Sequence, residues 1–419
     1  MSDETVPKIP NLTLAQHRFI LESGPSSHHA QAKAALLEGV RADGLCRCLC
    51  SCFQREHSRR NARLPRLCST KPHQTANAEM APFYALLVAQ FNWAADAVLS
   101  KDLADKNDAE IKKLDEKIAD AEANLGITDV SDALIAKATY LARIGEKDKA
   151  VAAFTLAYDK TGPLGTRIDL VFFKIRIGFF HNDLELITRN IEKARGLINE
   201  GGDWDRRNRL KVYEGIHRMS SRDFKGASDL LLDTLATFTS TELFEYKEFV
   251  RYAVLVAAIT LKRPDFKTKV INAPEILEVI HDIPNLSDYA NSLYRCEYDK
   301  FFTALAAIEQ EIKFDRLLHA HYRYYVREMR ILAYTQLLDS YRSLTIESMA
   351  NSFGVTEEFI DADLSKFISA GRLNAVIDKV GGIVETNRPD AKNAQYQATI
   401  KQGDLLLTRI QKLSRVISI

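Results

Sequence analysis

Two groups of residues in this sequence could bind a metal ion. Five of the six cysteines fall between Cys46 and Cys68, and four of these occupy alternate positions from Cys46 to Cys52. Thiolates and imidazoles are common ligands of Zn²⁺, and His57 and His73 lie in the same stretch. Zinc sites usually take cysteine pairs that are two to four residues apart, a spacing that strict alternation does not supply. We therefore predict no metal site in this segment.

The second group is His319-Ala320-His321, which has the H-x-H pattern of zinc-dependent isopeptidases. At the later positions where that motif has a serine and an aspartate, this chain has Met329 and Leu332. Phosphate-binding loops, H-E-x-x-H helices and G-x-S-x-G elbows are also missing from the sequence. We expect no bound metal, no cofactor and no enzymatic activity, and we expect the two histidines to lie at a helix start.

Composition favours a helical protein without a strong electrostatic preference. The 419 residues include 57 basic and 56 acidic side chains, so the net charge of +1 gives no long-range attraction to nucleic acid or anionic membranes. The 18 Gly and 11 Pro are few for this length. The chain begins without a basic segment followed by an apolar run, so we expect a protein of the cytoplasm and nucleus. The longest apolar stretch, Ala253–Leu261, predicts a buried helix.

The middle of the chain has the pattern of stacked helix pairs. A helix with one apolar stripe is predicted over Asp102–Leu125, with Gly126 as its end. Polar breaks then recur at 145–148, 181–183 and 221–223. The tripeptide Arg143-Ile144-Gly145 returns as Arg176-Ile177-Gly178 after 33 residues, close to the period of tetratricopeptide-type repeats. Such units bury their apolar faces only by stacking, which predicts a helical-repeat solenoid.

A winged helix-turn-helix is predicted after Leu344. Thr345–Phe353 has the pattern of a short helix ended by Gly354, and Thr356 can cap a second helix. Two β-prone stretches, 374–380 and 383–386, follow and can form a hairpin at Gly381-Gly382. Because the second helix carries more acidic than basic residues, it is poorly suited to face DNA phosphates, and we expect it to contact protein.

Two surfaces are candidates for partner contacts. Leu406, Ile410, Leu413 and Ile417 form one stripe on a helix that begins near Asn393. This helix could dock on its own domain or bind a partner. Trp204 and Arg207, among acids and bases in 203–211, could form a binding hot spot or simply begin a helix with internal ion pairs.

Four longer stretches carry a resemblance to a known family. They are Gly201–Tyr213 (GGDWDRRNRLKVY), His321–Arg330 (HYRYYVREMR), Val384–Asp390 (VETNRPD) and Gly403–Val416 (GDLLLTRIQKLSRV). They resemble the non-ATPase regulatory subunit six family of PCI-domain lid subunits in the 26S proteasome regulatory particle. The resemblance implies a non-catalytic scaffold in ubiquitin-dependent degradation. It would assemble with other PCI and regulatory-particle subunits through its winged helix and a helix bundle.

The resemblance also marks an insertion. In the family pattern Val40-Arg41-Ala42-Asp43 is followed almost at once by Met80, so about 36 residues are additional here. The abrupt edges and Arg/Cys-rich composition suggest a translated intron or gene-model error, and the segment lacks helical periodicity. We therefore expect an all-α chain with a helical segment at 1–40, this insertion at 41–79, a solenoid at 80–330, a winged helix at 331–390 and a bundle helix at 391–419.

Two alternatives of function remain open. A COP9 signalosome PCI subunit would have the same architecture, and co-purification with ATPase subunits would distinguish the two assemblies. A nucleic-acid-binding regulator would use the winged helix instead, and salt-sensitive binding to duplex DNA would support it.

Overall fold

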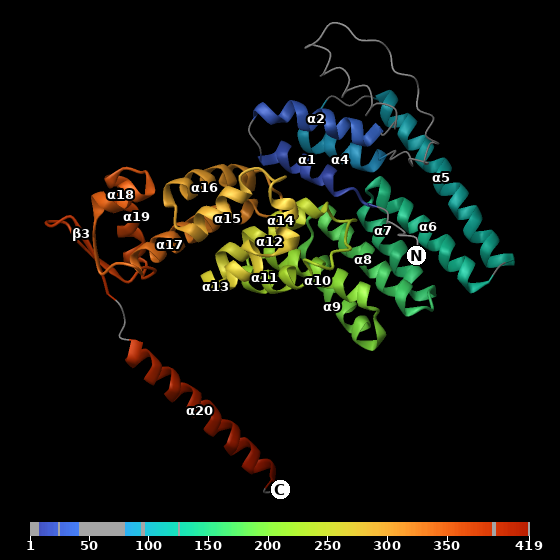
Figure 1. Cartoon of the computed structure of the whole chain (residues 1–419). Helices are drawn as coiled ribbons and strands as arrows, with labels where there is room; N and C mark the ends of the chain where they lie inside the picture. Colours follow the sequence, from blue (N-terminus) through green and yellow to red (C-terminus); the bar gives the residue numbers. More distant parts are fainter. Residues whose placement is uncertain are drawn as a thin grey trace. The chain divides into compact units, whose positions relative to one another are not determined.

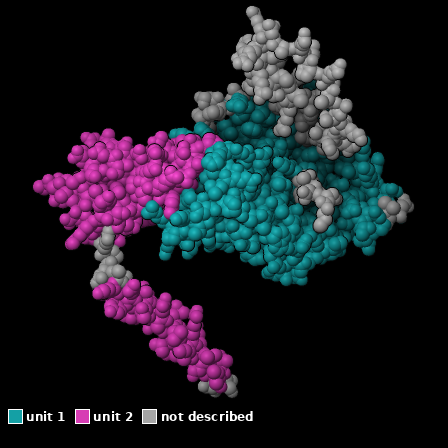
Figure 2. Space-filling model, viewed as in Figure 1, with its two compact units in different colours: residues 1–283, 310–322 teal, residues 284–309, 323–419 magenta. Residues whose placement is uncertain are grey.

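The computed structural model describes residues 8–23, 26–41, 80–93, 97–124, 126–387 and 391–417. It forms two compact units, coloured separately in Figure 2. Unit 1 comprises residues 1–283 and 310–322, and unit 2 comprises residues 284–309 and 323–419. Apart from Arg41, the predicted insertion lies outside the described residues, as do all its cysteines and histidines.

The first helices of unit 1 share one apolar core. Their bounds are α1 (Leu12–Ser23), α2 (Ser26–Arg41), α4 (Ala81–Phe91) and α5 (Ala97–Asn124). Leu36, Phe83 and Leu87 are fully buried in this core, and the ring of Phe83 lies 5.2 Å from that of Phe180. The start of the chain is therefore packed onto the repeat helices that follow.

Helix α5 confirms the predicted apolar stripe and ends at Asn124, close to the predicted end. Ile111 and Leu114 pack against the core of the next two helices, and Ala121 is buried. Gly126 lies outside α5 in an extended conformation, with φ of −84° and ψ of 171°, and it is the N-cap of α6. The glycine therefore begins the next helix.

Three antiparallel helix pairs form the centre of unit 1 and follow one another in Figure 1. Each predicted polar break lies between the two helices of a pair. Asp183 and Asp223 each cap the second helix of a pair by accepting a backbone N–H bond of 3.1 Å. The helices are α6 (Ile127–Ile144), α7 (Lys147–Lys160), α8 (Leu164–His181), α9 (Leu184–Gly201), α10 (Trp204–Ser220) and α11 (Phe224–Asp233).

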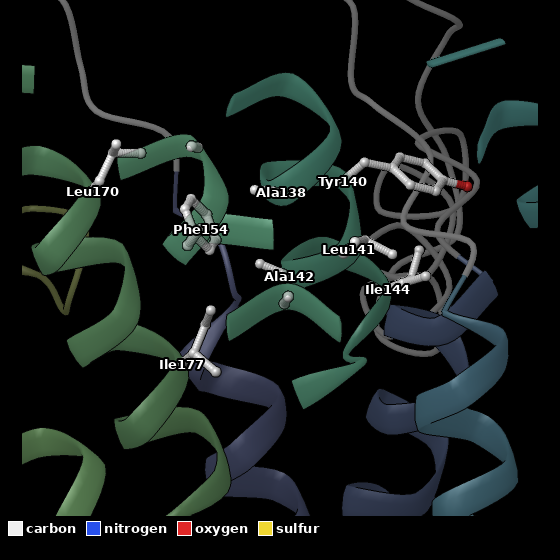
Figure 3. Packing of buried hydrophobic residues seen from close by; sticks show 10 residues of the cluster. Ala138, Tyr140, Leu141, Ala142, Ile144, Phe154, Leu170 and Ile177 are labelled. Carbon is white, nitrogen blue, oxygen red and sulfur yellow. The ribbon is translucent and has the colours of Figure 1, made fainter. Parts of the chain in front are cut away.

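Small residues allow these helices to approach closely. Ala138, Ala150 and Ala157 are completely buried, and Phe154 fills the space between α6, α7 and α8 (Figure 3). Residues from α8, including Ile177, complete the same cluster. One pair thus buries its outer face on the next pair, as a solenoid requires.

The recurrence of Arg-Ile-Gly after 33 residues does not mark equivalent positions. Gly145 ends α6 in the left-handed conformation with φ of 84°, whereas Gly178 lies inside α8, which ends at His181. A Cβ at Gly178 would lie 2.7 Å from Ile187, so this glycine permits the close approach of α9. The repeating unit is therefore the helix pair and not this tripeptide.

The remaining elements of unit 1 are α12 (Tyr246–Thr260), α13 (Arg263–Phe266), the π-helix η2 (Lys267–Ile271), α14 (Pro274–Ile280) and the 3₁₀ turn η3 (His319–His321). Residues 253–258 in α12 are buried, which confirms the predicted buried helix. In the part of the chain that the structure describes, no helix is long and apolar enough to cross a membrane.

The segment 310–322 returns to unit 1 and is held there by polar contacts. Asp315 is 4% exposed and forms a 2.7 Å ion pair with Arg251 of α12. Its neighbour Arg316 donates from the backbone to the side chain of Gln16 at 3.1 Å and from the guanidinium to the carbonyl of Phe179. Contacts from three separate helices therefore fix this short segment.

Unit 2 contains a helix group and the winged helix. The helices are α15 (Leu286–Arg295), most of α16 (Tyr298–Lys313) and most of α17 (Tyr322–Leu338). Phe353, at the end of the first winged-helix helix, is 1% exposed. Its ring lies within 4.9 Å of the ring centroids of Tyr298, Phe302 and Tyr334. This aromatic cluster joins the winged helix to α16 and α17.

The winged helix has the predicted order with one additional strand. Its elements are β1 (Ser343–Thr345), α18 (Ile346–Phe353), α19 (Glu357–Ser369), β2 (Ala375–Asp378) and β3 (Ile383–Thr386). Strand β3 pairs antiparallel with both β1 and β2, and Val384 is fully buried between Leu344 and Ile377. The hairpin loop takes in four residues, 379–382, and so is longer than the predicted Gly-Gly connection.

We predict that Phe353→Ala destabilises unit 2 by about 3–5 kcal/mol, because it empties a site lined by three aromatic rings. Urea unfolding followed by circular dichroism measures the loss. Phe359→Ala, at a position 38% exposed, is the control and should cost much less. Equal losses for the two variants would contradict the assigned role of Phe353.

Candidate protein-interaction surfaces

The terminal helix α20 (Ala391–Ile417) presents apolar side chains that nothing in its own chain covers in the described residues. The four residues of the predicted stripe are all exposed: Leu406 to 60%, Ile410 to 52%, Leu413 to 59% and Ile417 to 74%. Burial of such side chains is worth about 1.5–3 kcal/mol each, so this stripe would bind strongly to a complementary apolar surface.

The apolar surface of α20 is wider than the predicted stripe. Leu405, Leu407 and Val416 are also 56–71% exposed. With about 100° between successive residues, these positions and the stripe together cover an arc of roughly 200°. A contact with one helix needs a narrower seam, so this arc fits a helix surrounded by more than one partner helix.

Two of the acidic residues of α19 form ion pairs within unit 2. Asp363 is buried and forms a 2.9 Å ion pair with Arg330 of α17, and Asp361 pairs with Lys379 of the hairpin loop at 3.2 Å. Glu357 and Glu358 remain exposed in the first turn of α19. The free charge at the start of this helix is therefore negative.

The hairpin adds exposed apolar residues that the sequence analysis did not single out. Val376 is 53% exposed and Val380 is 100% exposed. Alternation along β2, in which Ala375 and Ile377 face the core side, could have indicated the outward position of Val376. An edge strand with such residues suits contact with protein.

Trp204 and Arg207 both lie exposed in the first turn of α10, with Trp204 at 61%. The charged residues around them form ion pairs within unit 1. Arg206 donates to both carboxylate oxygens of Asp169, at 3.1 and 2.7 Å, and this hydrogen bonding raises the pKa of the guanidinium. The helix-start interpretation is thus supported, and the two exposed side chains stay available for a partner.

His319 and His321 face different carbonyl groups. The ring of His319 donates from Nδ1 to the carbonyl of Lys313 at 2.7 Å, and that of His321 donates from Nε2 to the carbonyl of Ser220 at 2.8 Å. Both precede α17, as predicted. Among the residues that the structure describes, no three His, Cys, Asp or Glu side chains are grouped to hold a metal ion.

Comparisons with known families agree with this arrangement. Residues 96–269 match the family of 26S proteasome subunit RPN7, residues 298–388 match the PCI domain, and residues 395–417 match the RPN7/PSMD6 C-terminal helix of the 26S proteasome regulatory subunit. Helical repeats followed by this winged helix define a PCI-domain protein.

Curated relatives narrow the class. The chain is 53% identical over 340 residues to 26S proteasome non-ATPase regulatory subunit 6 homolog of Arabidopsis thaliana, covering 81% of the chain and 88% of the relative. It is 40% identical over 364 residues to regulatory subunit RPN7 of Saccharomyces cerevisiae, covering 81% and 85%. The chain belongs to the family of 26S proteasome non-ATPase regulatory subunit 6. The chain is 22% identical over 198 residues to COP9 signalosome complex subunit 1 of Arabidopsis thaliana, covering 47% of the chain and 45% of the relative.

The exposed acids of α19 predict weak binding to nucleic acid. We expect a labelled DNA duplex to bind with a dissociation constant above about 10⁻⁴ M in 200 mM salt, because nonspecific binding depends on lysine and arginine. Fluorescence anisotropy at 50 and 200 mM salt measures it. The double variant Glu357→Lys, Glu358→Lys should bind more tightly and with a steeper salt dependence. Micromolar, salt-sensitive binding by the wild-type chain would contradict this prediction.

Proposed function

We propose that this chain is a non-catalytic scaffold subunit of the proteasome lid that acts in ubiquitin-dependent protein degradation in the cytoplasm and nucleus. The observation that carries the proposal is the exposed apolar arc of α20, in the region that matches the family's C-terminal helix. Its partners are other PCI and regulatory-particle subunits. Helices of those subunits would bury the arc in a shared bundle.

The winged helix would provide a second contact. An ion pair of the buried Asp363 and the Phe353 cluster hold the module together, and its exposed features are an edge strand, apolar hairpin residues and acidic side chains. These features favour a neighbouring protein domain over DNA. They also suit a COP9 signalosome subunit, but the identity to subunit 6 relatives is much higher and favours the proteasome.

The double variant Leu406→Asp, Ile410→Asp should abolish assembly, because two carboxylates would be buried in an apolar bundle. Thr408→Asp is the matched control, since it adds the same side chain on the opposite side of the helix. Tagged full-length chains are purified, and co-purifying proteins are identified by mass spectrometry. We expect lid and ATPase subunits with the wild type and the control, and their loss with the double variant.

Other results would overturn this function. COP9 signalosome subunits without proteasome ATPases would favour the related complex. Absence of either set of subunits with the wild-type chain would remove the scaffold role, and retention of lid subunits by the double variant would exclude α20 as the main contact.

Trp204 and Arg207 are proposed as a further contact in the assembled particle. Trp204→Ala should lower the retention of lid subunits by about tenfold or more if the ring is a hot spot. Leu184→Ala is the control, because Leu184 is 46% exposed and starts α9 as Trp204 starts α10. Quantitative mass spectrometry after salt washes measures retention. Unchanged retention for Trp204→Ala would leave these residues with the helix-start role alone.

A further inference from the structure

Three cationic side chains gather around one aromatic ring in unit 1. The ring is that of Tyr158 on α7, and the nitrogen of Lys193 on α9 lies 3.6 Å from its centroid. From α8, the guanidinium carbon of Arg167 lies 5.4 Å and the nitrogen of Lys174 lies 5.8 Å from the same centroid. Residues of α8 and α9 therefore bring three positive groups within 6 Å of the centre of this ring, and Tyr158 itself packs on the core.

Lys174 forms the buried base of this cluster. Its side chain is 5% exposed, and its ammonium donates to the hydroxyl of Thr155 at 3.0 Å. Burial, followed by the positive charge of Lys193, lowers the pKa of Lys174 to about 8, while Asp159 acts in the opposite direction. Lys193 therefore places a second positive charge near that of Lys174.

Several cations in this part of unit 1 have direct acidic partners. Lys147 pairs with Asp183 at 2.7 Å, and Arg206 pairs with Asp169 at 2.7 Å. Within the described residues, Arg167, Lys174 and Lys193 form no such ion pair, and Arg167 instead donates to a backbone carbonyl at 2.6 Å. A buried lysine that lacks a carboxylate costs stability, which is unusual unless an external anion supplies the missing charge.

We propose that Arg167, Lys174, Lys193 and Tyr158 form a binding site for a phosphate group. A phosphate carries up to two negative charges and presents several acceptor oxygens, so it can accept from three separate donors at once. A carboxylate has one charge and two oxygens and would leave one cation unpaired. Lys193 is exposed and Tyr158 is partly exposed, which gives the ligand access from solvent. The site is independent of the proposed contacts of α20 and the winged helix.

Inorganic phosphate and O-phosphoserine are the probes, followed by ³¹P NMR line broadening with the full-length chain. We expect a dissociation constant on the order of 1 mM for so small a ligand. Lys193→Gln should weaken binding by about tenfold, because it removes one charge-assisted donor at an exposed position. Lys225→Gln is the matched control, since Lys225 is an exposed lysine on α11.

The two probes distinguish the source of the phosphate group. Tighter binding of O-phosphoserine indicates a phosphorylated protein side chain, and tighter binding of inorganic phosphate indicates a free ion. Equal binding of acetate, or unchanged binding by Lys193→Gln, would overturn the proposal.

A second variant tests the buried lysine through stability. The charges that act on Lys174 are those of Lys193 from α9 and Asp159 from α7, and its nitrogen lies near the ring of Tyr158. Its pKa is about 8 in the folded chain, whereas the ordinary pKa of a lysine is 10.5, so the unfolded chain binds more protons between these pH values. Wild-type stability therefore gains from this group as pH rises from 8 to 10.5.

Lys174→Met should consequently unfold at a higher temperature than the wild type at pH 7, and the difference should shrink towards pH 10.5. Addition of 10 mM phosphate at pH 7 should raise the unfolding temperature of the wild type and not of Lys174→Met. A phosphate-induced shift that is equal in both chains would overturn the assignment of Lys174 to the site.

Discussion

A helix pair of the kind formed by α6 and α7 can bury only one of its apolar faces by itself. The fully buried alanines at 138, 150 and 157 let Phe154 and the next pair close the other face. Each pair then depends on its neighbour, and α5 covers the first pair through Ile111 and Leu114. Unit 1 is consequently a cooperative stack, to which the 61% exposed side chain of Trp204 adds little apolar burial.

Unit 2 pairs two buried acidic side chains with arginines of the same unit. Arg330 neutralises Asp363, and Arg372 pairs with Glu328, so buried acids on α17 and α19 are matched within the module. The aromatic cluster at Phe353 supplies its apolar core. The apolar arc of α20 stays exposed among the described residues. Its large apolar side chains are therefore available for the proposed assembly contacts.

Local signals explain what the sequence could predict. The polar breaks at 181–183 and 221–223, the helix end at Gly354 and the stripe in α5 depend on neighbours within a few residues. Strand β1 has three residues, too few for periodicity, and was missed. The phosphate-site candidates lie on three helices, so no spacing in the sequence joins Tyr158 to Lys193. The repeated Arg-Ile-Gly suggested a false repeat, because glycine is favoured both by close packing, as at Gly178 against Ile187, and by a left-handed helix end, as at Gly145.

The return of residues 310–322 to unit 1 has a consequence for dividing this protein. The chain passes between the two units three times, after residues 283, 309 and 322. A fragment that stops at 283 would lose Asp315 and leave the guanidinium of Arg251 without its closest carboxylate, a loss on the order of 3–5 kcal/mol for a buried pair. It would also lose the peptide that joins Gln16 to Phe179. Each unit is built from two separate segments of the sequence. Two fragments made by dividing the chain at one position would therefore each lack part of a unit.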